Sequence, residues 1–218
     1  MKAVTISPRC LEAYPWMQFG YCFVKELAPM PDMRPLRERQ QLLELHVREN
    51  VATLSHAAKA ISRFYKTQGE KNRSHIESLV RSIHNGKTIK PVNYIVDSVM
   101  VAELTHALPL GVHDMNLVRG DILLDVAVAG EQFEGIGGRT VVTRPNEVVL
   151  RDEIGVWASY TQGPDSRTII QPGTRDVMFL GFFTPETHRE QILQGLHDAV
   201  GTLLQVAEGR ADQVTILP

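Results

Sequence analysis

The chain has 218 residues, of which 43% are hydrophobic and 22% charged, and its formal net charge is −2. This composition excludes an intrinsically disordered chain, and the presence of only two cysteines excludes a disulfide scaffold. No apolar run approaches the length of about 18 residues that a membrane span needs, and no secretory leader follows Met1. We therefore expect a soluble, cytoplasmic protein with no membrane partner.

The N-terminal elements are predicted from the spacing of apolar residues. Alternation over residues 2–7 and an apolar run over residues 16–24 predict two strands, joined by a turn at residues 8–15. Apolar residues then recur at helical spacing from Leu36 to about Thr67. One long helix, or two in succession, is therefore expected after the strands.

Two further helices are predicted from residues typical of helix ends. Ser74 with Glu77 has the form of a capping box, and Gly86 is typical of the residue that follows a helix. Pro91 suits the first turn of the next helix, which covers residues 92–107 and is apolar on nearly all sides. This last helix is therefore expected in the core.

Short apolar runs separated by Gly, Pro and Asn fill the region that follows. They are DILLDVAVA, EQFEGI, RTVVT, EVVLRDE, GVWASYT, SRTII and DVMFLGFF. Strands at this density predict antiparallel sheet over residues 122–183, in a sandwich or a barrel-like sheet. A final helix is predicted over residues 184–208, with Thr184 as N-cap and Pro185 in the first turn. The predicted fold class is α+β.

The glycine-rich segment GEQFEGIGGR and the two cysteines were tested as cofactor and metal sites. Gly135, Gly137 and Gly138 precede a strand rather than a helix, so a hairpin turn fits them better than a phosphate loop. Cys10 and Cys22 have no further ligands at zinc spacing and are expected to be buried thiols. The sequence therefore predicts no cofactor and no metal.

Positive charge is concentrated between Lys59 and Lys90. This segment holds eight Lys or Arg against Glu70 and Glu77, a net charge of +6, so the remainder of the chain carries −8. A solvated helical face is one interpretation, and a surface that binds phosphates is the other. The candidate RNA-binding side chains are Lys66, Lys71, Arg73, Arg81, Lys87 and Lys90.

Two stretches are candidates for a functional site. The first is the pair His113-Asp114, which follows the apolar helix and a Pro-Leu-Gly turn. The second is a run of polar residues around a Gly-Pro turn: Tyr160, Thr161, Gln162, Asp165, Ser166, Arg167 and Thr168. Loops on a rigid sheet often carry function, but Asp, Ser and Thr are also ordinary turn residues. An ion pair of Arg167 with Asp165 is the structural alternative.

The order of these segments resembles the B3/B4 domain of the bacterial phenylalanyl-tRNA synthetase beta subunit, and more closely its free-standing relatives. The segments that carry the resemblance are Val96-Asp97 in the apolar helix, LPLGVHD, GDILLDVAVAGEQFEGIGG, EVVLRDEIGV and TRDVMFLGFF. The similarity runs from about Ile61 to Val206. We therefore predict an editing-type domain over residues 59–218. Residues 1–58 are expected to pack on it, giving one compact unit.

The resemblance implies a β-sandwich of unusual topology flanked by helices. In the synthetase this domain hydrolyses tyrosine that is wrongly esterified to the phenylalanine tRNA. The resemblance thus implies the acceptor end of a tRNA and its amino-acid moiety as partners. It implies His113 and Asp165 as catalytic candidates, with His113 as general base or water-positioner. The substrate-binding candidates are Asp97, Asp114, Tyr160, Thr161, Gln162, Ser166, Arg167 and Thr168, among which Thr161, Ser166 and Arg167 are expected to donate to the ester or the ribose.

The chain also departs from the synthetase pattern. The Thr-Asn pair of the synthetase helix falls on Val99 and Met100, and the histidine of its Pro-Leu-His exit falls on Gly111. Its pair of small pocket residues falls on Tyr160 and Thr161, and its Gly-Gly-Glu falls near residues 164–166. No aminoacylation module is expected within these 218 residues. Two functions are therefore expected as alternatives: an aminoacyl-tRNA deacylase acting in trans, or a non-catalytic module that binds an amino acid, nucleotide or other small ligand.

Overall fold

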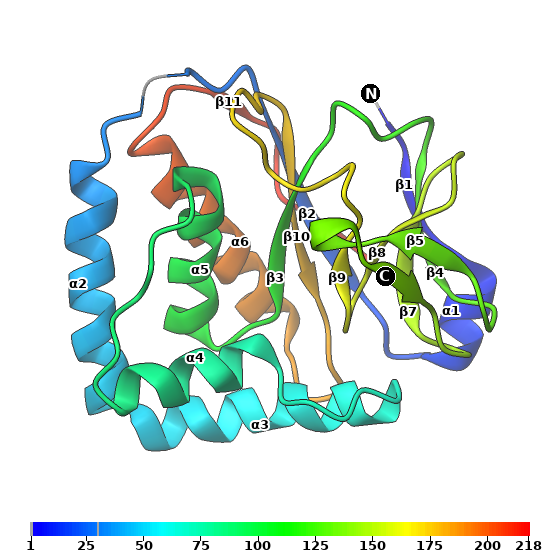
Figure 1. Cartoon of the computed structure of the whole chain (residues 1–218), viewed down its shortest axis with the longest axis horizontal. Helices are drawn as coiled ribbons and strands as arrows, with labels where there is room; N and C mark the ends of the chain where they lie inside the picture. The colour runs from blue at the N-terminus through cyan, green and yellow to red at the C-terminus, as the bar shows by residue number, and fades with distance from the viewer. Residues whose placement is uncertain (1, 30) are drawn as a thin grey trace.

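Two sheets form the centre of the molecule, and most of the helices lie on one side of them (Figure 1). The computed structural model describes residues 2–29 and 31–218. The helices are α1 (Pro8–Ala13), α2 (Arg34–Glu49), α3 (Val51–Thr67), α4 (His75–His84), α5 (Tyr94–His106) and α6 (Arg189–Leu204), with a short 3-10 turn η1 (Ile136–Gly138). The strands are β1 (Val4–Ile6), β2 (Phe19–Lys25), β3 (Leu110–Asp114), β4 (Ile122–Val126), β5 (Gln132–Glu134), β6 (Thr140–Val142), β7 (Val148–Arg151), β8 (Val156–Ser159), β9 (Gly163–Pro164), β10 (Val177–Phe182), β11 (Arg210–Ala211) and β12 (Thr215–Leu217).

The α+β prediction is confirmed. One sheet has the order β1-β4-β7-β8-β9, and the other has the order β11-β2-β10-β3 with β12 paired to β2. Pairing is antiparallel throughout both sheets except between β1 and β4, where Val4 lies opposite Ile122 in a parallel pair. The predicted sheet is therefore split between two layers, and the N-terminal strand joins the first of them.

Helices α5 and α6 pack against each other and cover the second sheet, as Figure 1 shows. Helix α5 is buried over most of its circumference, as its apolar sequence predicts. All six residues of β10 are buried, because it lies between β2 and β3 in the second sheet and α6 packs on it. One hydrophobic cluster runs from Val4 to Ile216. The boundary predicted between residues 58 and 59 stays a prediction.

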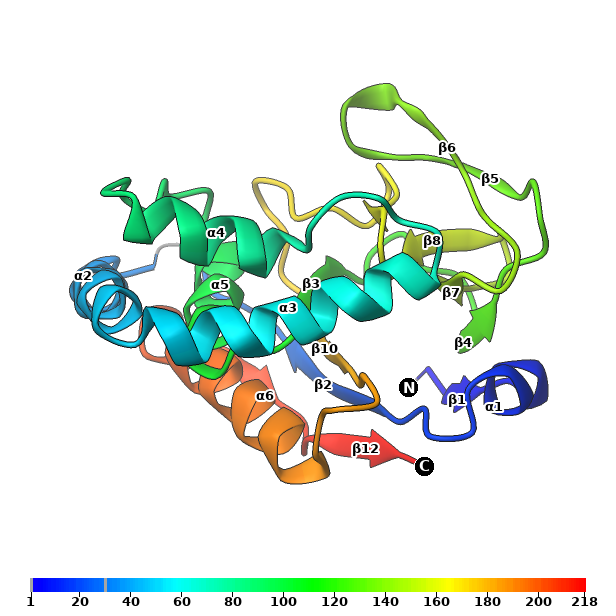
Figure 2. The same cartoon turned by 90° about the horizontal axis from the view of Figure 1, so that it is seen from below.

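The β5–β6 hairpin projects from the first sheet on the same side of the molecule as α4 (Figure 2). Gly137 and Gly138 have φ angles of +75° and +76° at its tip. This left-handed conformation is unfavourable for residues with a Cβ, so the glycines form a hairpin turn as predicted. A small cluster that includes Phe133 and Val141 holds the hairpin against β7 and β8.

Several predicted boundaries were wrong, because side-chain caps set the helix ends. Residues 8–13 form α1 instead of a turn, since Ser7 accepts a hydrogen bond from the Cys10 N–H at 3.0 Å. Helix α5 begins after Asn93, whose side chain accepts from two backbone N–H groups, and not at Pro91. Helix α6 begins after His188, whose N–H donates to the Gln191 side chain at 2.8 Å. Thr184 and Pro185 belong to the turn before it.

The helical segment over residues 36–67, expected as one helix or two, is two helices separated at Asn50. Cys10 and Cys22 are buried and free, as expected. Within residues 2–29 and 31–218, no helix is long and apolar enough to cross a membrane.

Asp125 on β4 ties three elements together. Its carboxylate accepts from Ser7 and Arg9 at the start of α1 and forms an ion pair with Arg151 on β7 at 2.9 Å. Burial raises the pKa of Asp125, but these hydrogen bonds and charges lower it by more. The pKa of Asp125 is therefore below its ordinary value.

We expect Asp125→Asn to reduce the free energy of unfolding at pH 7 by about 1.5–3 kcal/mol, the usual effect of losing hydrogen bonds to a charged group. Because the pKa of this carboxyl is lower in the folded than in the unfolded state, the ionised side chain stabilises the fold at pH values above its unfolded pKa, near 4. This contribution is lost as the pH falls through the folded pKa. Urea unfolding at pH 7 and below pH 4 checks this. A constant difference between variant and wild type across that range would contradict it.

Candidate functional site

A pocket of about 510 Å³ opens between α4, β3 and the end of β8. Its wall is formed by four parts of the chain: the segment from Tyr65 to His75, residues 109–113 with strand β3, residues 158–164, and Leu180 and Phe182 of β10. Arg139, from the tip of the β5–β6 hairpin, completes the wall, and its guanidinium donates to the Gln162 carbonyl at 2.7 Å. The pocket therefore lies where the two sheets and the helical layer meet.

The structure places only part of the predicted site in this pocket. The predicted residues that line it are His113, Tyr160, Thr161 and Gln162. Those that lie outside its wall are Asp97, Asp114, Asp165, Ser166, Arg167 and Thr168. The residues outside the wall bond the backbone of neighbouring segments or hold His113 in place.

His113 lies on strand β3 and not in a loop, because β3 pairs with β10 up to Asp114. Its side chain is only 6% exposed and packs edge-on against the Trp157 ring, with 4.8 Å between ring centroids. This burial lowers the pKa of His113 to about 3, so the imidazole is neutral at physiological pH. His113 is therefore part of the core packing as well as of the pocket wall.

A chain of hydrogen bonds joins His113 to Asp165. The Nδ1 atom of His113 lies 3.2 Å from the Thr168 hydroxyl, which lies 2.8 Å from an Asp165 carboxylate oxygen. The hydroxyl has one proton and the carboxylate can only accept, so Thr168 donates to Asp165 and accepts from Nδ1. This assigns the proton of His113 to Nδ1 and leaves Nε2 as an acceptor. A Cβ at Gly111 would lie 3.8 Å from Nε2, so the glycine keeps this side open.

Asp165 closes a turn behind His113. One carboxylate oxygen accepts from the Thr168 N–H at 2.9 Å, and the other accepts from Arg167 at 2.7 Å. Arg167 also pairs with Asp152 at 3.2 Å. This turn replaces the strand that was predicted over residues 166–170, because the Asp165 side chain takes up the Thr168 N–H that a strand would need. The alternative in which Arg167 pairs with Asp165 is confirmed.

Asp97 and Asp114 hold backbone near the ends of their elements. Asp97 is fully buried and accepts from the Val92 N–H at 2.9 Å, and burial raises its pKa despite this bond. Asp114 accepts from the Asn116 N–H at 2.8 Å and from the Thr174 hydroxyl. Their predicted contact with a substrate is not favoured by these positions.

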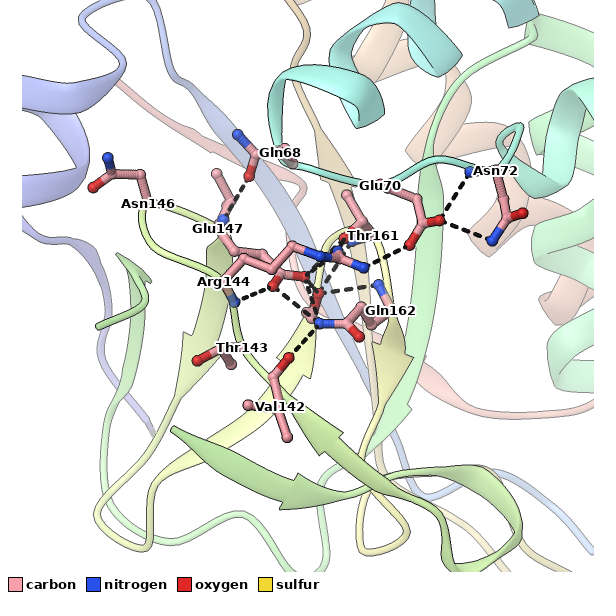
Figure 3. Close-up of polar contacts among 12 residues, drawn as sticks. Gln68, Glu70, Asn72, Val142, Thr143, Arg144, Asn146, Glu147, Thr161 and Gln162 are labelled. Atoms are coloured by element: carbon pink, nitrogen blue, oxygen red, sulfur yellow. Dashed lines mark hydrogen bonds and ion pairs between the residues drawn. The ribbon is translucent and has the colours of Figure 1, made fainter. Parts of the chain in front are cut away.

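Glu147, which sequence reasoning missed, organises the pocket rim (Figure 3). Its side chain is 0% exposed and accepts from Thr161 at 2.7 Å, from Gln162 at 3.0 Å and from the Ser159 hydroxyl. Arg144 donates its backbone N–H to the same carboxylate at 2.9 Å and its guanidinium to Glu70 at 3.1 Å. The buried carboxylate thus fixes Thr161 and Gln162, and Arg144 links them to the segment after α3.

Comparison with known families assigns the chain to a family. A family model described as "B3/4 domain" matches residues 60–198, well over half of the chain. The chain belongs to the B3/4 domain family. The suspected resemblance to this domain is thereby confirmed.

Two curated relatives are phenylalanine–tRNA ligase beta subunits. The one from Mycoplasma genitalium is 32% identical over 100 residues, which cover 46% of this chain and 12% of that protein. The one from Nitrobacter winogradskyi is 30% identical over 90 residues, which cover 36% of this chain and 11% of that protein. The chain thus spans about an eighth of the length of the curated relatives that it matches.

A solved structure shows the same fold. An N-terminal fragment of the phenylalanyl-tRNA synthetase beta subunit from Pyrococcus horikoshii superposes with a TM-score of 0.54 and 14% identity. The superposition covers 99% of this chain and 54% of that chain. At this identity the similarity concerns the fold alone.

A basic cleft of about 560 Å³ adjoins the pocket of this B3/4 domain. Its basic lining residues are Lys59, Arg63, Lys66, Lys71 and Arg73. Asn72 and Arg73 line both the cleft and the pocket. Arg63 pairs with Glu186 and Arg73 with Glu77, whereas no acidic side chain in the described residues lies within 4.0 Å of the lysines of the cleft. Of the other predicted RNA-binding residues, Arg81, Lys87 and Lys90 lie outside its lining.

Within the described ranges, no group of three or more His, Cys, Asp or Glu side chains is arranged to hold a metal ion.

Proposed function

We propose that this B3/4 domain binds the aminoacyl end of a tRNA and hydrolyses the ester of a mischarged one in trans. The observation that carries the proposal is the contact between a pocket of about 510 Å³ and a cleft lined by five basic side chains. The cleft suits the phosphates of an acceptor end, and the pocket suits an amino-acid moiety with its ester bond. Membership of the B3/4 family and the similarity to synthetase beta subunits also support tRNA as the partner.

The pocket offers the two things that ester hydrolysis needs: an acceptor that positions water and donors for the developing oxyanion. Nε2 of the neutral His113 accepts a hydrogen bond from the water. Arg139, which lies at the surface of the pocket, supplies N–H groups beyond the one that bonds the Gln162 carbonyl. Thr161 gives its proton to Glu147, so it faces the substrate as an acceptor and not as the donor that the sequence predicted.

A non-catalytic binding module is the second candidate, and one observation favours it. Val99 and Met100, at the positions of the Thr-Asn pair of the synthetase, are buried apolar residues with exposures of 4% and 9%. Neither can take part in catalysis. A module of this kind would keep the pocket for an amino acid, a nucleotide or another small ligand and would leave an ester intact.

The cleft provides a test of RNA binding with a matched control. We expect Lys66→Glu with Lys71→Glu to weaken tRNA binding at least about tenfold at 0.1 M salt. The slope of the logarithm of the binding constant against the logarithm of the salt concentration is expected to become shallower by about two. Lys87→Glu with Lys90→Glu makes the same change in net charge outside the cleft and is expected to cost much less. Filter binding or fluorescence anisotropy over a salt series measures both.

Equal losses in the two double variants would show that only the total charge matters. Unchanged affinity in the cleft variant would leave the basic stretch as a solvated face, which is the alternative that the sequence left open.

A further inference from the structure

A second histidine of the pocket is held by a buried carboxylate. His75 is the first residue of α4 and lines the pocket, and its Nε2 atom lies 2.7 Å from Oε1 of Glu103 on α5. Glu103 is 5% exposed, and the same oxygen accepts from the Leu110 N–H of β3 at 3.2 Å. Because a carboxylate only accepts, the neutral imidazole carries its proton on Nε2 and presents the lone pair of Nδ1. No protein group in the described part of the chain bonds Nδ1.

His75 and His113 differ in how well they can accept a proton. His113 is buried and its pKa is lowered to about 3, so it has little affinity for a proton at neutral pH. The side chain of His75 is 49% exposed. Burial on the Glu103 side lowers the pKa of His75, but the charge and hydrogen bond of Glu103 raise it to a net value above the ordinary one. A base with a pKa near the working pH is the most effective in proton transfer.

The other titratable groups of the pocket wall do not compete for this role. They are Tyr65, Glu70, Arg73, His113, Arg139 and Tyr160. Glu70 is bonded to Asn72 and Arg144, and these contacts lower its pKa. Burial raises the pKa of Tyr65 and Tyr160, so both remain neutral hydroxyls. Glu103 is thus the acidic partner that faces His75.

We propose that His75 is the catalytic base of this pocket and that Glu103 is its positioning residue. The inference rests on the proposed hydrolysis. The oxygen of a water attacks the ester carbonyl carbon while Nδ1 of His75 takes one of its protons, and the carbonyl electron pair moves to the oxygen. The carbon–oxygen bond to the ribose then breaks, and the proton on His75 passes to the ribose oxygen. The products are the free amino acid and the terminal hydroxyl, with no other reactant needed.

The test uses the full chain and a tRNA transcript esterified in turn with each standard amino acid. We expect His75→Gln to lower the rate on the hydrolysed ester by 10²–10⁴-fold, the range for loss of a general base. His84→Gln replaces the exposed histidine at the other end of the same helix and is expected to leave the rate unchanged. Thermal unfolding of both variants shows whether the fold is retained.

Glu103→Gln keeps an acceptor for Nε2 and for the Leu110 N–H but removes the charge. The pKa of His75 then falls, so the acidic limb of the rate profile moves to lower pH, because the base is free of its proton at a lower pH. A merely structural role of Glu103 changes the height of the profile and not the position of this limb.

The outcomes separate the inference from the function on which it rests. Hydrolysis by the wild type with a loss of less than threefold in His75→Gln overturns the role of His75 and leaves the proposed function standing. An unmoved acidic limb in a folded Glu103→Gln variant overturns the role of Glu103. Absence of hydrolysis of every ester by the wild type overturns both proposals together.

Discussion

Glu147→Ala is expected to destabilise the protein by about 3–5 kcal/mol, the usual effect of removing one partner from a buried ionic network. The side chain is 0% exposed, and its loss leaves the Ser159 and Thr161 hydroxyls, the Gln162 amide and the Arg144 N–H without their acceptor. Each of these donors is partly or fully buried, so water replaces the lost bonds poorly. Thr161 and Gln162 also lose the contact that fixes them at the pocket rim.

Glu147→Gln provides the matched control. The amide keeps the volume and one acceptor oxygen, so we expect a clearly smaller loss of stability than in Glu147→Ala. Urea unfolding of the two variants measures the difference. A cost below about 1 kcal/mol for the alanine variant, the level of a surface ion pair, would contradict a buried and well-bonded carboxylate.

His113→Ala is expected to slow ester hydrolysis by about 10²-fold or more, because the water loses its acceptor at Nε2. The same change removes the contact with Trp157 and opens a cavity in the core, so we also expect a loss of about 2–5 kcal/mol in stability. His113→Gln fills more of this space, and it separates the two effects when its rate and its unfolding are measured together.

Asp165→Asn tests how much the hydrogen bonds that join Asp165 to His113 through Thr168 contribute to the rate of hydrolysis. Asparagine still accepts from the Thr168 hydroxyl, so the tautomer of His113 is preserved and the loss of rate is expected to be smaller than for His113→Ala. A loss as large as that of His113→Ala, in a folded variant, would assign a direct role to Asp165 and would contradict its position behind the pocket wall.

The fold was largely predictable because its signals are local. Alternation and apolar runs located the strands from β4 to β8 and β10, but not β9, which lies in the predicted Gly-Pro turn. The all-apolar pattern placed α5 in the core. The errors occurred where one side chain competes for backbone hydrogen bonds. Asn93 and His188 set helix starts that proline positions had suggested elsewhere, and Asp165 replaced a predicted strand by a turn.

The site was less predictable, because its contacts join residues far apart in the sequence. His113 and Asp165 were expected to be close only through the family resemblance. Thr168, whose hydroxyl joins them, was predicted as a substrate-binding residue and not as this link. The pair His75–Glu103 spans two helices. Glu147 precedes a buried strand, and nothing in its neighbourhood in the sequence distinguishes it from a residue of a solvated turn.

The proposed activity of the pocket is hydrolysis of an aminoacyl ester of tRNA. Its most direct test is the rate of amino-acid release when the purified full chain meets the transcript esterified in turn with each standard amino acid, against the spontaneous rate of each ester. We expect acceleration of at least one ester, with most of it lost in His75→Gln and in His113→Ala. Spontaneous rates for every ester, together with saturable binding of a free amino acid or nucleotide, would contradict it and identify a binding module.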